Sequence, residues 1–136
     1  MQGDQPAKSA AKRILIVEDN ELNMKLLHDV LEVHGYALVT AGEGAAALAL
    51  ARETRPDLIL MDLQLPDISG LDAVRQLKED GETRHIPVVA VTAFAMVGDE
   101  EKALAAGCDG YVAKPIQLLD FLGVVKRFIG EADRFR

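Results

Sequence analysis

Five polar residues follow short apolar runs, and their side chains could together hold a cation and a phosphoryl group. Glu18 and Asp19 come directly after RILIV, and Asp62 comes after LILM. Thr92 closes IPVVAVT, and Lys114 follows GYVA. A carboxylate at the end of a buried run is costly unless positive charge balances it. Acid oxygens and water are ligands that Mg²⁺ prefers, and the lack of His and Cys at these positions argues against Zn²⁺.

These residue types also suit phosphoryl transfer. Two carboxylates about 4 Å apart repel by about 4 kcal/mol at an effective dielectric of 20, so three together need a cation or must take up protons. An aspartate can act as a nucleophile and hold a phosphoryl group as an acyl phosphate. A metal ion, the Lys114 ammonium and the Thr92 hydroxyl could neutralise or bond the phosphoryl oxygens.

The chemistry requires that these residues meet, and the pattern of elements predicts that they do. Short apolar runs alternate with amphipathic stretches along the chain. Strands are predicted at 13–17, 36–41, 57–61, 86–92 and 109–114, and helices at 20–35, 43–54, 71–80, 98–107 and 118–130. Five such β–α units predict an α/β, doubly wound, flavodoxin-like parallel sheet in strand order 2-1-3-4-5. The carboxyl ends of its strands then share one edge, with the ligand site between strands 1 and 3.

Composition limits the classes of function. The chain has 136 residues, 49% of them hydrophobic, which indicates one globular domain. A net charge of −7 argues against a nucleic-acid surface. The single cysteine, Cys108, cannot form an internal disulfide, which favours a cytoplasmic location. No apolar run is long enough for membrane insertion, and residues 1–12, which lack an apolar segment, are expected to form a flexible tail.

Four segments carry a family resemblance that covers residues 13–130. LIVEDN, LILMDLQLPDISG, VVAVTAFA and YVAKPI resemble the receiver domain of two-component response regulators. The resemblance implies a CheY-like (βα)₅ fold. It makes Asp62 the phosphoacceptor, Asp19 a direct Mg²⁺ ligand and Glu18 a ligand through water. The backbone carbonyl of Gln64 would complete the metal site, where Mn²⁺ could replace Mg²⁺.

The resemblance assigns further roles at the last two strands. Thr92 is the switch hydroxyl, Tyr111 the rotating aromatic and Lys114 the cation that pairs with phosphate. The peptide bond from Lys114 to Pro115 is expected to be cis.

Residues two positions after the phosphoacceptor and two after the switch residue flank the path of the hydrolytic water. These residues are Gln64, whose side chain could hydrogen-bond a water, and Phe94, which has no group to orient one. Slow loss of the phosphoryl group is expected because of Phe94.

The family also implies partners. Longer segments, such as ARETRPDLILMDLQLP, resemble stand-alone receivers of alphaproteobacterial cell-cycle and cell-division signalling. Only EADRFR, residues 131–136, follows the last helix, so no output domain is expected. Phosphoryl donors would be histidine kinases or histidine phosphotransfer proteins, docking on the first helix and on the face formed by helix 4, strand 5 and helix 5. The chain is expected to be a monomer or weak dimer and a signalling protein, not an enzyme.

Two alternatives remain open on the residues alone. An aspartate-nucleophile phosphatase or phosphotransferase commonly has a second Asp two positions after the nucleophile, where this chain has Gln64. A flavodoxin-like nucleotide binder needs a phosphate-binding loop after strand 1, where Glu18 and Asp19 would repel phosphate. The segment GEGAAA, residues 42–47, has the letters of a dinucleotide fingerprint, but it follows strand 2.

Overall fold

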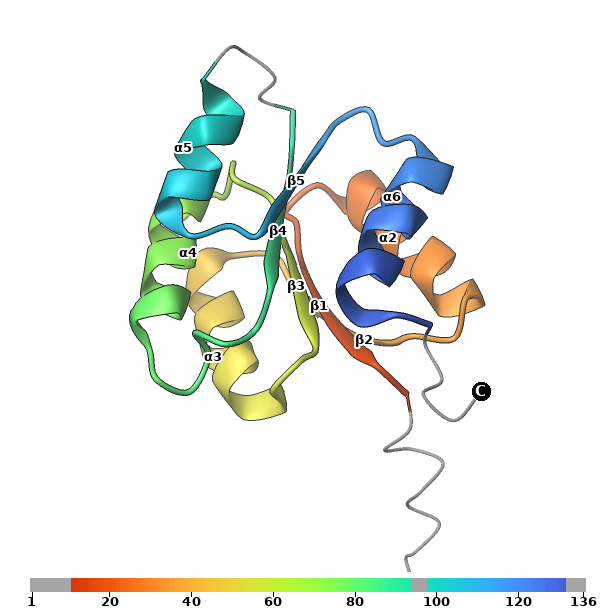
Figure 1. Ribbon diagram of the computed structural model, residues 1–136, viewed down its shortest axis with the longest axis horizontal. Coiled ribbons are helices and arrows are strands. Elements are labelled where there is room, and N and C mark those ends of the chain that lie inside the picture. Colours follow the sequence, from red (N-terminus) through yellow and green to blue (C-terminus); the bar gives the residue numbers. More distant parts are fainter. Residues whose placement is uncertain (1–10, 94–97, 132–136) are drawn as a thin grey trace, which may run out of the picture.

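The sheet has five parallel strands in the order β2-β1-β3-β4-β5, as predicted. The structure is a computed structural model that describes residues 11–93 and 98–131. Figure 1 shows the strands side by side at the centre of the molecule. Their bounds are β1 Arg13–Val17, β2 Ala37–Ala41, β3 Leu58–Met61, β4 Val88–Thr92 and β5 Gly110–Ala113.

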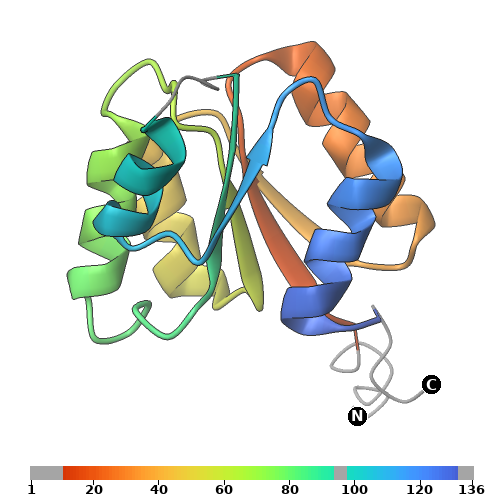
Figure 2. The ribbon, with the colours of Figure 1, turned by 45° about the horizontal axis from the view of Figure 1, so that its top comes forward.

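Five helices cover the two faces of the sheet. In Figures 1 and 2, α2 and α6 lie on one face, and α3, α4 and α5 lie on the other. Right-handed crossovers place helices on both faces of such a sheet. The helices are α2 Glu21–Val33, α3 Gly44–Thr54, α4 Gly70–Glu79, α5 Asp99–Ala106 and α6 Leu118–Ile129.

The central strands β1, β3 and β4 are almost entirely apolar because both of their faces are buried. Side chains alternate between faces along a strand. In β1, Leu15 and Val17 pack in the core under α3, α4 and α5, whereas Ile14 and Ile16 pack in the core under α2 and α6. This alternation also decides to which face each strand-end residue belongs.

Strands β2 to β5 begin one or two residues later than expected, and local contacts explain this for β2 and β4. The Tyr36 N–H donates to the Leu31 carbonyl at 3.2 Å, so it closes helix α2 and does not join the sheet. Pro87 has no N–H to give to a neighbouring strand, although its carbonyl still accepts from Ile59 at 3.0 Å. The Ile86 N–H donates to Thr83 within the preceding turn. Local turns therefore use the backbone groups that a longer strand would have required.

Asn20 and His34 cap the two ends of α2. The side chain of Asn20 accepts a hydrogen bond from the Asn23 N–H at 2.9 Å, so Asn20 is the N-cap. His34 is the C-cap, and Gly35 follows it. Gly35 has φ 91°, and its N–H bonds to Glu32 O, the arrangement in which a left-handed glycine ends a helix.

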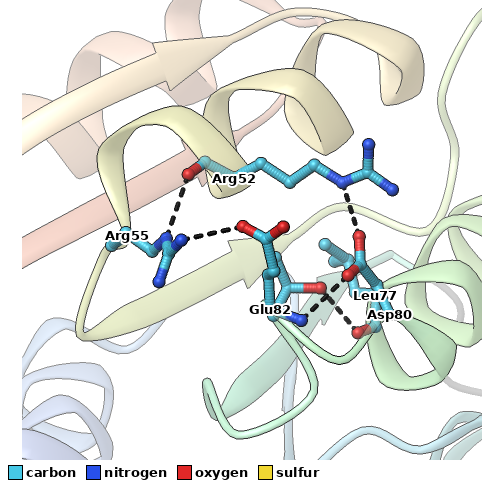
Figure 3. Close-up of polar contacts among 6 residues, drawn as sticks. Arg52, Arg55, Leu77, Asp80 and Glu82 are labelled. Carbon is cyan, nitrogen blue, oxygen red and sulfur yellow. Dashed lines mark hydrogen bonds and ion pairs between the residues drawn. The ribbon is translucent and has the colours of Figure 1, made fainter.

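Ion pairs hold α3 to the loop after α4, as Figure 3 shows. Arg52 pairs with Asp80, and Arg55 pairs with Glu82 at 2.7 Å. The Glu82 N–H also donates to Asp80 Oδ1 at 2.9 Å. These contacts lie near the C-terminal ends of the two helices, away from the strand ends that carry the acids. Within residues 11–93 and 98–131, no helix has the length and hydrophobicity that crossing a membrane requires.

Candidate functional site

Three carboxylates meet at the carboxyl ends of β1 and β3. These strands are neighbours, with Val17 opposite Met61, so the residues that follow them are brought together. Glu18, Asp19 and Asp62 each have a carboxylate oxygen within 4.8 Å of the others. Glu18 and Asp62 are 3% and 4% exposed, whereas Asp19 faces solvent. The predicted convergence of the acids is therefore present.

Lys114 supplies the positive charge within this group. Its Nζ lies 2.7 Å from Glu18 Oε1 and 3.4 Å from Asp62 Oδ2. The alternation of side chains explains the contact, because all three residues continue the strand positions that face α2 and α6. Lys114 lies at the end of β5, and its side chain is mostly buried over this edge of the sheet.

The charge balance leaves room for a further cation. Burial raises the pKa of Glu18, the ammonium of Lys114 opposes that rise, and the nearby Asp62 adds to it. Three carboxylates thus share one ammonium. A divalent ion with oxygen ligands, such as Mg²⁺, fits this donor set, which contains no nitrogen or sulfur ligand among the described residues.

The loop after β3 orients the Asp62 carboxylate. The Gln64 N–H donates to Asp62 Oδ1 at 2.9 Å, which leaves Oδ2 as the oxygen nearest to Lys114. The Asp62 N–H in turn donates to the Val17 carbonyl at 2.9 Å, fixing the backbone against β1. The side chain of Gln64 is exposed beside the acids.

Thr92 and Tyr111 belong to the other face of the sheet. Thr92 is fully buried at the end of β4, two residues beyond Ala90, which is paired with Tyr111. Both side chains therefore follow the alternation toward the core under α3, α4 and α5, against which Tyr111 packs. Burial raises the pKa of the Tyr111 phenol, and the carboxylates of Asp99 and Glu100 add to the rise. The Lys114 N–H donates to the Thr92 carbonyl at 2.8 Å, which links the two groups through the backbone.

The other features singled out in the sequence are the Lys114–Pro115 peptide bond, Cys108 and Phe94. The peptide bond between Lys114 and Pro115 is cis. Cys108 is buried, and burial raises the pKa of its thiol to about 11, which is typical of a packing residue and not of a reactive thiol. Phe94 lies outside the described residues, as do most of the two predicted tails.

A residue that the sequence reasoning missed is Asp67, in the loop between β3 and α4. Its carboxylate accepts hydrogen bonds from the N–H groups of Gly44 and Ala45 at the start of α3. That helix end lies within GEGAAA, where a dinucleotide would need the same N–H groups for its phosphates. The contact joins residues more than twenty positions apart, and no local pattern could reveal it.

Comparison with known proteins agrees with this geometry. The family described as response regulator receiver domain matches residues 14–126. The chain belongs to the response regulator receiver family. Receivers of this family are signalling domains that accept a phosphoryl group, and they interact with histidine kinases and phosphotransfer proteins.

Over the matched region, receivers among the relatives share more than half of their residues with the chain. It is 55% identical over 121 residues to the polar-differentiation response regulator DivK of Brucella anthropi, covering 89% of this chain and 98% of the relative. The DivK of Brucella abortus strain 2308 is 54% identical with the same coverage. This chain is thus a DivK-like receiver.

Solved receiver structures share the fold and hold metal. The receiver domain of sensor histidine kinase PA1611 from Pseudomonas aeruginosa PAO1 has a magnesium ion in its active-site cleft. It is 36% identical, with a TM-score of 0.82 and coverage of 90% of this chain and 100% of that one. The Mn²⁺-bound response regulator Rcp1 is 30% identical, with a TM-score of 0.73 and coverage of 85% and 90%.

Proposed function

We propose that this receiver takes a phosphoryl group on Asp62, with Mg²⁺ bound beside it, and uses the change to alter its contacts with other proteins. The observation that carries the proposal is the buried group at the sheet edge. Glu18 and Asp62 are almost fully buried, and within the part of the chain that the structure describes the one ammonium paired with both is that of Lys114. Such a site is electrostatically incomplete without a cation. Backbone N–H groups hold both buried acids, that of Gln64 on Asp62 and that of Asn20 on Glu18.

The proposed metal ligands are the acids and one backbone group. Asp19 and Asp62 would bind Mg²⁺ directly, the Gln64 carbonyl would add an oxygen, and Glu18 would act through water. Mn²⁺ would substitute, since it accepts the same oxygen donors. When bound, the ion neutralises charge on the phosphoryl oxygens. The metal-bound receivers among the solved structures support this assignment.

The chain's own residues then perform the transfer. An oxygen of Asp62 attacks the phosphorus, the P–N bond to the donor histidine breaks, and the imidazole nitrogen leaves with its electron pair. The Gln64 N–H holds Oδ1, so the carboxylate is oriented before the donor arrives. Lys114 can shift from Glu18 toward the new phosphoryl oxygens, because it already lies 3.4 Å from Asp62.

Thr92 and Tyr111 are proposed to carry the change to the surface. The Thr92 hydroxyl would bond a phosphoryl oxygen, and Tyr111 would turn inward into the space vacated. Thr92 and Tyr111 lie on the same face of the sheet in adjacent strands, which supports this coupling. The output surface would be the α5–β5–α6 face, which is the helix 4, strand 5 and helix 5 face of the sequence prediction. Tyr111, Gln117 and Val124 line a hollow between β5 and α6 on this face.

The donor is proposed to dock on α2, beside the acids. Leu22 is 80% exposed and Leu26 is 41% exposed on the outer side of this helix, next to the site. Exposed apolar side chains grouped on one helix suit contact with another helix. The partners would be a histidine kinase, a histidine phosphotransfer protein, or both, without nucleic acid or membrane.

The biological role is proposed from the relatives. Both are named polar-differentiation response regulators, which supports a part in cell-cycle and division control. Since the chain covers 98% of each relative, we propose a stand-alone receiver of residues 13–130 with short tails at 1–12 and 131–136. It would be a cytoplasmic monomer or weak dimer that acts as a phosphoacceptor and not as an enzyme on other substrates.

Labelling by acetyl phosphate tests the proposal. The wild-type protein should gain one phosphoryl group in the presence of Mg²⁺ and none in the presence of a chelator, as measured by intact mass. Asp19→Asn should bind Mg²⁺ at least tenfold more weakly by calorimetry, since it removes a direct ligand. Asp72→Asn, an exposed acid of α4, is the matched control and should behave like wild type. Equal Mg²⁺ affinity in Asp19→Asn and wild type would contradict the metal assignment.

A further inference from the structure

The N-terminus of α3 is capped by a residue from another part of the chain. Asp67 Oδ1 accepts from the Gly44 N–H at 2.8 Å, and Asp67 Oδ2 accepts from the Ala45 N–H at 3.0 Å. The local N-cap residue, Glu43, makes no side-chain capping bond. The bonds from Ala45 and Gly44 lower the pKa of Asp67 below its usual range. Both oxygens of one carboxylate thus join the loop after β3 to α3.

Close packing supports this junction. A Cβ on Gly44 would lie 2.4 Å from Ile68 Cγ1, so the loop touches the helix start at a second point. At the far end of the loop, a Cβ on Gly70 would lie 2.4 Å from Leu63 Cα and 2.7 Å from the Asp62 carbonyl oxygen. The Gly70 N–H donates to the Leu63 carbonyl at 3.2 Å. The loop is therefore closed on itself at its base and attached to α3 near its middle.

Gln64 lies between these two points of attachment. Its N–H orients Asp62, and its carbonyl is the proposed backbone ligand of Mg²⁺. The side chain of Gln64 is exposed, so few contacts of its own would fix its backbone. The position of that peptide must then depend on the residues that hold the loop at either side.

We propose that Asp67 is a positioning residue of the phosphorylation site, which fixes the loop carrying Gln64 by binding the N-terminus of α3. This inference rests on the proposed function of the Asp19 and Asp62 site. Asp67 touches neither the metal nor the phosphoryl group, and it acts through the loop. Loss of the junction should loosen the Gln64 backbone and weaken metal binding, since supporting contacts of this kind change metal affinity by about tenfold to a hundredfold.

The test must separate loop positioning from helix capping. Asp67→Ala removes both bonds to α3 and is expected to lower Mg²⁺ affinity about tenfold. Glu43→Ser adds a local capping side chain to α3, so the double variant Glu43→Ser, Asp67→Ala regains the cap without regaining the junction. Mg²⁺ titration by calorimetry and amide hydrogen exchange of the metal-free proteins are the measurements, with Asp72→Ala as the surface control.

The double variant decides the outcome. We expect it to recover thermal stability while Mg²⁺ affinity stays low and the Gln64 amide exchanges at least tenfold faster than in wild type. If Mg²⁺ affinity and the exchange rate of the Gln64 amide both returned to their wild-type values, Asp67 would only cap the helix, and the inference would be overturned. Wild-type affinity in Asp67→Ala would overturn it too. Failure of the wild-type protein to bind Mg²⁺ would instead overturn the proposed function, and this inference with it.

Discussion

Lys114 Nζ lies 2.7 Å from Glu18 Oε1, which is closer than its 3.4 Å approach to Asp62 Oδ2. In the protein without metal or phosphate, the ammonium is therefore held chiefly by Glu18, which is not the proposed phosphoacceptor. Both carboxylates are almost completely buried. Lys114 thus compensates buried charge, and it lies near enough to Asp62 to follow the charge that the proposed phosphorylation would add there.

Replacing Lys114 by Met should destabilise the metal-free protein. The substitution leaves Glu18 and Asp62 buried without their cation, and breaking a buried ion pair in this way costs about 3 kcal/mol. Urea unfolding at pH 7 measures the loss, and added Mg²⁺ should restore part of it because the ion supplies positive charge. Lys126→Met, at an exposed ion pair with Glu131, should change little. A fully stable Lys114→Met protein would refute this charge balance.

Thr92→Ala should separate phosphorylation from its readout. Asp62 and Lys114 remain, so acetyl phosphate should still label the variant. Without the hydroxyl, the shift of Tyr111 should be lost, because a ligand moves an equilibrium only through contacts that differ between the states. Ring-proton NMR of Tyr111 before and after labelling is the measurement. Thr92→Ser, which keeps the hydroxyl, should retain the shift. An unchanged Tyr111 response in Thr92→Ala would contradict the assignment.

The sequence was sufficient for the arrangement of the strands and for the meeting of the acids. Apolar runs identified the strands, and the shared carboxyl edge of a parallel sheet brought Glu18, Asp19 and Asp62 together. Other features depend on tertiary contacts. The junction of Asp67 with Gly44 and the preference of the ammonium for Glu18 arise only when distant segments pack.

The ion pair between Arg52 and Asp80 should contribute stability that depends on pH (Figure 3). The Glu82 N–H and then Arg52 lower the pKa of Asp80. A lowered carboxyl pKa stabilises the fold above the unfolded-state pKa of about 3.9, and this contribution is lost as pH falls through the folded-state pKa. Asp80→Asn should therefore melt a few degrees below wild type at pH 7 and equal it near pH 2. Asp72→Asn is the control for the loss of one negative charge. If Asp80→Asn lowered the melting temperature equally at pH 7 and near pH 2, the prediction would be contradicted.

Phe94→Glu should shorten the lifetime of the phosphorylated protein. The family resemblance predicts that this position lies beside the path of the hydrolytic water, where a carboxylate could orient that water and Phe cannot. Removing about 1.4 kcal/mol from the barrier would speed the loss roughly tenfold. Decay of labelled protein with Mg²⁺ and without kinase is the measurement. No acceleration, or a wild-type lifetime of seconds, would contradict the prediction of a long-lived phosphoryl group.

Phosphotransfer onto Asp62 is the most direct test of the whole account. A phosphorylated histidine kinase would be mixed with wild-type protein, with Asp62→Asn and with the control Asp57→Asn, each with Mg²⁺. Borohydride reduction converts an aspartyl phosphate to homoserine, which peptide mass spectrometry locates. We predict homoserine at position 62 in the wild type and in Asp57→Asn, and no transfer to Asp62→Asn. Transfer to Asp62→Asn at the wild-type rate, or homoserine at another position in the wild type, would contradict the account.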